Sequence, residues 1–134
     1  MGDMRAVSPD VMDYLEHGFK CWNVRAIDQM MDMYTADAEV DVSRLLPDES
    51  VLRGRDQIRA YYDRMWETWS GFGWKPCEMA DLGEGKYAVL VRLDAEGRGS
   101  GTPVTSELTV FYDLVDGLIA RAAFEPGRCA QLQG

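Results

Sequence analysis

An arginine and an aspartate near the end of an extended segment are the clearest candidates for acid–base chemistry in this sequence. Arg92 and Asp94 are two residues apart in "KYAVLVRLDAEG" (86–97), so on a strand they share one face with Ala88 and Leu90. A neighbouring guanidinium lowers the pKa of a carboxyl group, which suits a positioned base or hydrogen-bond acceptor rather than a general acid. The alternative is a surface ion pair, worth only about 0–1 kcal/mol.

Two further groups that can take part in proton transfer lie on the first predicted helix, "SPDVMDYLEHGFKCWN" (8–23). Tyr14 belongs to the apolar stripe of this helix, where a buried hydroxyl needs a partner and can stabilise a carbonyl or an enolate. It can equally be an ordinary core residue. His17 is the only histidine, a residue type that often takes part in proton transfer, but it lies beside the stripe. We predict Asp94 as the base or orienting acid, with Arg92 and Tyr14 assisting.

The acidic stretch "DAEVDVSRLLPDESVLRG" contains five carboxylates, and the facing of its strand decides whether any of them lines a pocket. The segment "AEVDV" (38–42) alternates in the way that a half-buried strand does. Val40 and Val42 are therefore expected to face the interior, and Glu39 and Asp41 to face water or a partner. A shift of one residue would reverse every facing on this strand.

Aromatic residues and eight methionines indicate a wide apolar cavity with adaptable walls, although at helical spacing such residues can equally form an ordinary core. We find no glycine-rich phosphate loop, metal-ligand cluster or nucleophile triad in the sequence, which predicts that no cofactor or metal is needed. The predicted substrate-binding set is His17, Trp22, Tyr34, Val40, Val42, Tyr62, Trp66, Tyr112 and Phe124.

The elements that must position these residues can be predicted from periodicity. Helices are expected over residues 8–23, 24–35 and 55–69, because their apolar residues recur at spacings of three and four. Strands are expected over 38–42, 74–83, 86–97, 104–115 and 118–126, with turns at "GEG", "GRGSGTP" and "DG" and a loop at "LLPDESVLRG". The order predicts one α+β domain, residues 1–134, with a mostly antiparallel sheet.

Composition excludes some partners. The chain has 134 residues and a net charge of −9, which argues against nucleic acid and against an anionic membrane surface. No run approaches the roughly 20 apolar residues of a membrane-spanning helix, and the first residues do not read as a signal peptide. The three cysteines, Cys21, Cys77 and Cys129, are widely spaced, so we expect free thiols and a cytoplasmic protein.

The element order and four motifs resemble the SnoaL-like polyketide cyclases of the nuclear transport factor 2-like superfamily. The motifs are "YTADAEVDV", "LRGRDQIRAYY", "EGRGSG" and "DGLIARAAF". The resemblance implies a cone-shaped, curved sheet wrapped around three helices and enclosing a cavity. Members of the superfamily include cyclases, isomerases, dehydratases, epoxide hydrolases and binding proteins, so the fold alone leaves the chemistry open.

The same resemblance places apolar residues where relatives carry catalytic groups. Val42 stands where the isomerases have their aspartate, and Val40 and Val42 where the epoxide hydrolases hold water. Phe124 stands where the cyclases and epoxide hydrolases carry an aspartate. Arg92 and Asp94 match the Arg-x-Asp of limonene epoxide hydrolase. We therefore expect Val40, Val42 and Phe124 to face one cavity together with Arg92 or Asp94.

These patterns favour a protein that takes a hydrophobic small molecule. The leading hypothesis is a cofactor-independent cyclase, isomerase or dehydratase that acts on a hydrophobic carbonyl or polyketide-like substrate by proton transfer. The alternatives are a non-catalytic ligand-binding protein and an interaction module in which the dimer matters. A homodimer packed sheet to sheet is expected, through an outer face that includes Thr105, Glu107, Thr109, Phe111, Ile119, Arg121 and Ala123.

Overall fold

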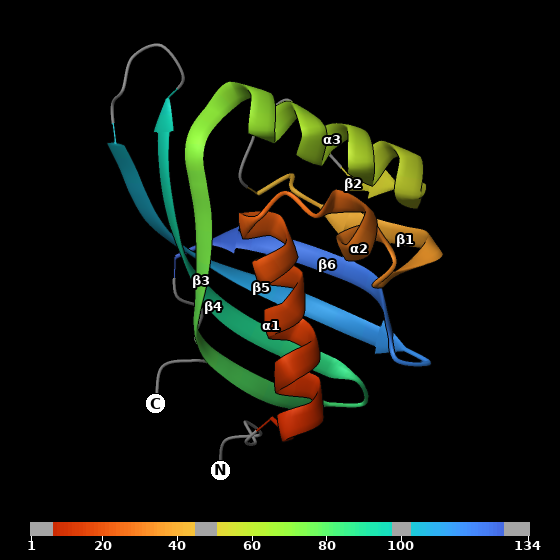
Figure 1. Cartoon of the computed structure of the whole chain (residues 1–134). Coiled ribbons are helices and arrows are strands. Elements are labelled where there is room, and N and C mark those ends of the chain that lie inside the picture. The colour runs from red at the N-terminus through yellow and green to blue at the C-terminus, as the bar shows by residue number, and fades with distance from the viewer. Residues whose placement is uncertain (1–6, 45–50, 98–102, 128–134) are drawn as a thin grey trace.

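The described residues of the computed structural model, 7–44, 51–97 and 103–127, form six strands in one curved sheet with helices against one face (Figure 1). The strand order is β2-β1-β6-β5-β4-β3. Among these strands, β1 and β6 pair in parallel and the other neighbours pair antiparallel, which confirms the predicted α+β class. The elements are α1 (Pro9–Asn23), α2 (Ile27–Met31), β1 (Tyr34–Asp41), β2 (Val51–Arg53), α3 (Gly54–Thr68), β3 (Trp69–Gly83), β4 (Lys86–Gly97), β5 (Pro103–Val115) and β6 (Leu118–Pro126).

The two long helices follow the predicted periodicity. The Ser8 hydroxyl accepts a hydrogen bond from the Val11 N–H at 3.4 Å, and Pro9 occupies the first turn of α1. The residues buried by α3 recur at spacings of three and four, and they are Ile58, Tyr61, Tyr62 and Trp66. No helix in the described ranges combines the length and the apolar character required to cross a membrane.

The second helix is much shorter than predicted. The prediction over 24–35 was wrong at its end, because α2 stops at Met31 and Tyr34 opens β1. The cause is a long-range pairing: the Ile119 N–H donates to the Met33 carbonyl at 2.7 Å, and Tyr34 is paired with Ile119 in the parallel ladder. Helical spacing in the sequence cannot reveal a partner strand that lies 85 positions away.

The predicted hairpin turns at "GEG" and "DG" are confirmed. Both central residues of the β5–β6 turn have positive φ, 54° at Asp116 and 81° at Gly117, and Glu84 and Gly85 in the β3–β4 turn do likewise, at 58° and 78°. The predicted turn at "GRGSGTP" lies mostly outside the described residues. The predicted loop "LLPDESVLRG" was wrong at its end, where β2 pairs Leu52 with Val40.

A bulge in β6 sets which of its side chains face the interior. Asp113 is paired with Arg121 and Leu114 with Ile119, which leaves Ala120 as an extra residue. The alternation therefore changes phase at Ala120: Ile119, Ala122 and Phe124 belong to the core side. The prediction that Ile119 lies on the outer face was wrong for this reason.

Candidate functional site

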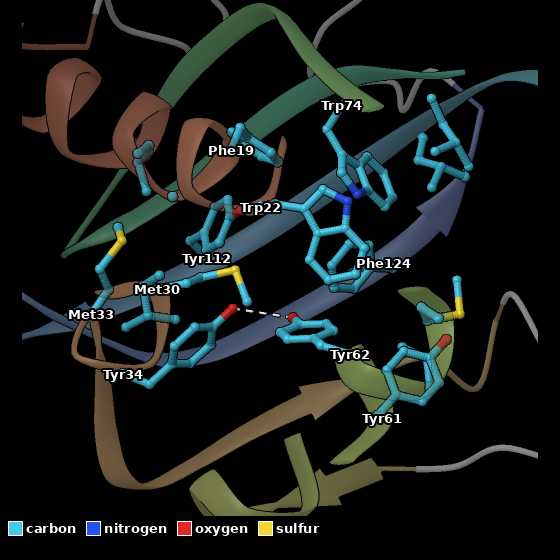
Figure 2. A pocket seen from close by; sticks show the side chains of 17 residues that line it. Phe19, Trp22, Met30, Met33, Tyr34, Tyr61, Tyr62, Trp74, Tyr112 and Phe124 are labelled. Carbon is cyan, nitrogen blue, oxygen red and sulfur yellow. Dashed lines mark hydrogen bonds between the residues drawn. The ribbon is translucent and has the colours of Figure 1, made fainter. Parts of the chain in front are cut away.

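A cavity of about 100 Å³ lies between α1, α3 and the inner face of the sheet (Figure 2). Its wall is almost entirely apolar. Three methionines, Met30, Met33 and Met65, form part of it, and each has rotatable bonds that allow it to repack around different shapes. Aromatic rings form much of the remainder, from Phe19 and Trp22 on α1 to Trp74 on β3 and Phe124 on β6.

Tyrosine hydroxyls, together with the indole N–H groups of Trp22 and Trp74, are the polar side-chain groups of the residues that line this cavity. Tyr34 comes from the start of β1 and Tyr62 from the middle of α3, and their hydroxyl oxygens lie 3.1 Å apart (Figure 2). Tyr112 on β5 and Tyr61 on α3 also line the cavity. All four side chains are buried. The cavity thus contains hydroxyl groups that can donate or accept a hydrogen bond in apolar surroundings.

Burial keeps these phenols neutral. It raises the pKa of Tyr34 to about 12, although the hydrogen bond with Tyr62 acts in the opposite direction. Burial also raises the pKa of Tyr62 and of Tyr112 well above 10.0, and the neighbouring tyrosines add to both effects. At neutral pH each of these groups is a hydrogen-bond donor and a poor base.

The charged pair predicted as the catalytic centre lies elsewhere. Arg92 Nε and Asp94 Oδ1 are 3.6 Å apart, but their side chains are 54% and 56% exposed. Asp94 accepts a hydrogen bond from the Thr105 hydroxyl at 2.9 Å. Leu93, between them, is the residue of this segment that lines the cavity. The prediction that Arg92 or Asp94 faces the cavity was therefore wrong.

The reason lies in the run that precedes the pair. Ala88, Val89, Leu90 and Val91 are all buried, so both faces of β4 are apolar there and the alternation does not show which face is the cavity. The inner face turns out to carry Val89, Val91 and Leu93. The cavity wall in the described part of the chain includes no carboxylate, imidazole, ammonium or guanidinium group. Across all the described residues, no three His, Cys, Asp or Glu side chains lie together in a way that could hold a metal ion.

The two candidates on α1 have other contacts. The Tyr14 hydroxyl donates to the Met33 carbonyl at 2.8 Å, and burial raises the pKa of Tyr14 while the nearby Ile119 N–H lowers it. Tyr14 thus fixes the connection between α2 and β1. His17 is exposed, and its Nε2 lies 3.4 Å from Cys21 Sγ. Neither side chain is part of the cavity wall, which corrects both predictions.

Comparison with known proteins identifies the fold and the family. The family profile described as the SnoaL-like domain matches residues 15–122, most of the chain. The chain belongs to the SnoaL-like domain family. No protein of curated function matches its sequence.

Solved structures with this SnoaL-like fold include enzymes and proposed enzymes. SalBIII, an epoxide hydrolase/cyclase-like enzyme in pyran ring formation in the polyether salinomycin, is 17% identical, with a TM-score of 0.74 over 87% of this chain and 89% of SalBIII. TerC, co-crystallised with polyporic acid, is 17% identical, with a TM-score of 0.74 over 90% of this chain and 92% of TerC. A proposed polyketide cyclase from Sinorhizobium meliloti is 25% identical, with a TM-score of 0.63 over 84% of this chain and 94% of that protein.

The facing predicted for the acidic strand of this SnoaL-like chain is confirmed. Val42 and Phe124 line the cavity, whereas Val40 is fully buried in the core and is not part of the wall, which corrects the prediction that Val40 faces the cavity. Glu39 and Asp41 lie on the outer face, where Arg121 Nη2 is 3.1 Å from Asp41 Oδ2. The Ser43 hydroxyl and N–H, together with Arg121, lower the pKa of Asp41. These carboxylates are therefore surface groups paired with arginine.

Most of the predicted aromatic set is brought together. Trp22, Tyr34, Tyr62, Tyr112 and Phe124 line the cavity, whereas Trp66 is buried behind Trp22 at a ring separation of 5.4 Å. Their roles in binding stay predictions. Sequence reasoning missed Tyr61, although its helical spacing from Ile58 and Met65 was a usable signal. It also missed the hydroxyl contact of Tyr34 with Tyr62, for which the sequence contains no signal.

Proposed function

We propose that this SnoaL-like protein binds a small hydrophobic molecule that carries a carbonyl oxygen, which accepts a hydrogen bond from the tyrosine hydroxyls. The single observation behind the proposal is the contact of Tyr34 with Tyr62 inside an otherwise apolar cavity. Ligand pockets commonly combine apolar walls with a few polar groups that fix orientation. A bound carbonyl would take one hydroxyl donor from this pair.

The size of the cavity limits what enters without rearrangement. An apolar cavity of about 150 Å³ holds one benzene molecule, so the present 100 Å³ is too small for even a single ring without rearrangement. Rotation of Met30, Met33 and Met65 would enlarge it. A larger carbonyl compound is therefore proposed to bind by repacking the methionine side chains rather than by moving strands.

A cofactor-independent cyclase, isomerase or dehydratase is the second candidate. The observation that favours it is again the tyrosine cluster, because neutral donors of raised pKa stabilise negative charge that develops on a carbonyl oxygen. The likeness to SalBIII and to the Sinorhizobium meliloti protein also supports it. The cavity wall described above supplies no strong base, so binding is the better supported function. An interaction module would be favoured by a collapsed cavity.

The test compares acetophenone with ethylbenzene, which has a similar shape and lacks the oxygen. The double variant Tyr34→Phe/Tyr62→Phe should weaken acetophenone binding by about 5- to 150-fold, because a buried carbonyl left without a donor costs about 1–3 kcal/mol. Ethylbenzene binding should change little. Titration calorimetry measures both affinities, and the carbonyl ¹³C shift of labelled acetophenone reports the hydrogen bond directly.

Asp94→Asn is the matched control for this experiment. Asp94 is exposed and outside the cavity wall, so this variant should bind both compounds as the parent does. The proposal fails if the double Phe variant weakens both compounds equally. It also fails if Asp94→Asn removes the preference for acetophenone over ethylbenzene, because that result would indicate Arg92 and Asp94 as the binding site.

We also propose a homodimer that packs through the outer face of the sheet. The partly exposed side chains of Leu82 and Phe111 on that face support it; they pack on a second apolar cluster, Ala80, Ala88 and Leu90, which is already buried within the single chain. Light scattering at micromolar concentration should give about twice the chain mass of 15.1 kDa. A monomer under those conditions would remove this proposal.

A cytoplasmic location is the remaining proposal. Cys21 and Cys77 are free thiols in the structure, one buried and one exposed, and Cys129 lies outside the described residues. Free thiols are typical of reducing compartments, which supports the proposal.

A further inference from the structure

One end of the cavity lies closer to solvent than the other. Among its lining side chains, Met65, Trp74, Leu93 and Phe124 are partly exposed, while the tyrosines are buried. Figure 2 shows Trp74 and Phe124 at one end of the group and Met33 and Tyr34 at the other. The end where Trp74 lies is therefore a route by which a ligand reaches the tyrosine hydroxyls from solvent.

The Trp74 ring spans this end of the cavity. Its centroid is 6.5 Å from Phe19 and 6.3 Å from Trp22, both on α1, and 6.0 Å from Phe124 on β6. Trp74 thus connects β3 with the helix on one side and with a more central strand on the other. If its backbone moves, all three contacts change together.

The strand β4 holds this backbone on one side, where Trp74 is paired with Leu93, and a side chain of α1 holds it on the other. Asn23, the last residue of α1, donates from Nδ2 to the Trp74 carbonyl at 2.9 Å, and its Oδ1 accepts from the Trp74 N–H at 2.8 Å. β3 is an edge strand of the sheet, with β4 as its neighbour. The amide group of Asn23 therefore bonds to the edge of β3 as a residue of an adjacent strand would.

We propose that Asn23 is a positioning residue that holds Trp74 across the mouth of the cavity and so sets the rate of ligand exchange. One of the three register shifts between β3 and β4 lies between Ser70 and Gly73, directly before Trp74. Regular pairing on the β4 side resumes with Gly73 and Asp94. The inference rests on the proposed function, because a gate matters only where the cavity takes a ligand.

The test measures exchange of fluorobenzene by ¹⁹F NMR. Fluorobenzene needs no hydrogen bond from the tyrosines, so it reports on passage even if carbonyl recognition is wrong. Asn23→Ala removes both hydrogen bonds to Trp74 and should raise the association and dissociation rates together by about tenfold, from two bonds of ordinary strength. The dissociation constant should stay within about twofold, because Asn23 is not part of the cavity wall.

Two further variants make the result specific. Asn23→Asp keeps the acceptor for the Trp74 N–H and loses the donor, so its rates should be intermediate, and it decides the matter if Asn23→Ala does not fold. Lys20→Ala, at an exposed position on the same helix, should exchange as the parent does.

Three results would overturn the gate. They are unchanged rates in Asn23→Ala and Asn23→Asp, a faster dissociation matched by an equal loss of affinity, and failure of fluorobenzene to reach the cavity in any variant. Faster exchange of fluorobenzene, with no effect of the tyrosines on acetophenone, would keep the gate and reject carbonyl recognition.

Discussion

Replacing Trp22 by alanine should cost about 3–5 kcal/mol of the free energy of unfolding, the range typical of a buried Trp or Phe truncated to Ala. Trp22 is 4% exposed and lies at the centre of the aromatic cluster, 5.0 Å from the Tyr62 ring and 5.4 Å from the Trp66 ring. The truncation removes these contacts and enlarges the existing cavity. Single domains have about 5–15 kcal/mol of stability in total, so much of it would be lost.

Denaturant and thermal unfolding followed by circular dichroism check this expectation. The melting temperature should fall by roughly 10 °C or more for a domain of this size. Val24→Ala is the matched control, because Val24 lies two residues further along the chain and is 74% exposed. That substitution should stay within about 0.5 kcal/mol of the parent. A loss below about 1 kcal/mol in Trp22→Ala would contradict the packing described for α1.

The protein should lose stability steeply as the pH rises from 10 to 12. Tyrosine in the unfolded chain titrates near pH 10, whereas the folded protein raises the pKa of Tyr34 to about 12 and those of Tyr62 and Tyr112 well above 10.0. Above pH 10 the unfolded chain releases protons that the folded chain retains, so unfolding becomes favoured. The stability is present in full below pH 10. A difference of about two pKa units for Tyr34 corresponds to about 2.7 kcal/mol, which is lost in full only once the pH has passed the folded-state pKa of about 12.

Two spectroscopic signals test the alkaline transition. Phenolate absorbance from the buried tyrosines Tyr34, Tyr62 and Tyr112 should rise together with the loss of the circular dichroism signal. The Tyr34→Phe/Tyr62→Phe variant should retain more of its neutral-pH stability at pH 11 than the parent does. If all six tyrosines ionise near pH 10 while the fold persists, the buried cluster is not as described.

Local patterns in the sequence determined where the helices and hairpins form and which side chains of the acidic strand face the interior. The stripe of apolar residues along α1 and α3, and the glycine in the Asp116-Gly117 turn, predicted where helices and hairpins would form. On β1 only one face is apolar, so alternation alone placed Val42 inside and Asp41 outside. The resemblance in four motifs then predicted the family that the profile match shows. All of these signals come from residues that are close together in the chain.

Only the tertiary structure decided which polar groups meet in the cavity. β4 is apolar on both faces from Ala88 to Val91, so its sequence did not show that Arg92 and Asp94 face solvent. The extra residue Ala120 reversed the facing of Ile119. Tyr34 was predicted in a helix but belongs to β1, because it pairs with Ile119 of β6. The hydroxyls of Tyr34 and Tyr62 meet across 28 positions of the chain. Alternation and helical periodicity fix the relative facing of neighbours along one element, whereas contacts between elements depend on register, bulges and packing, which the whole chain sets together.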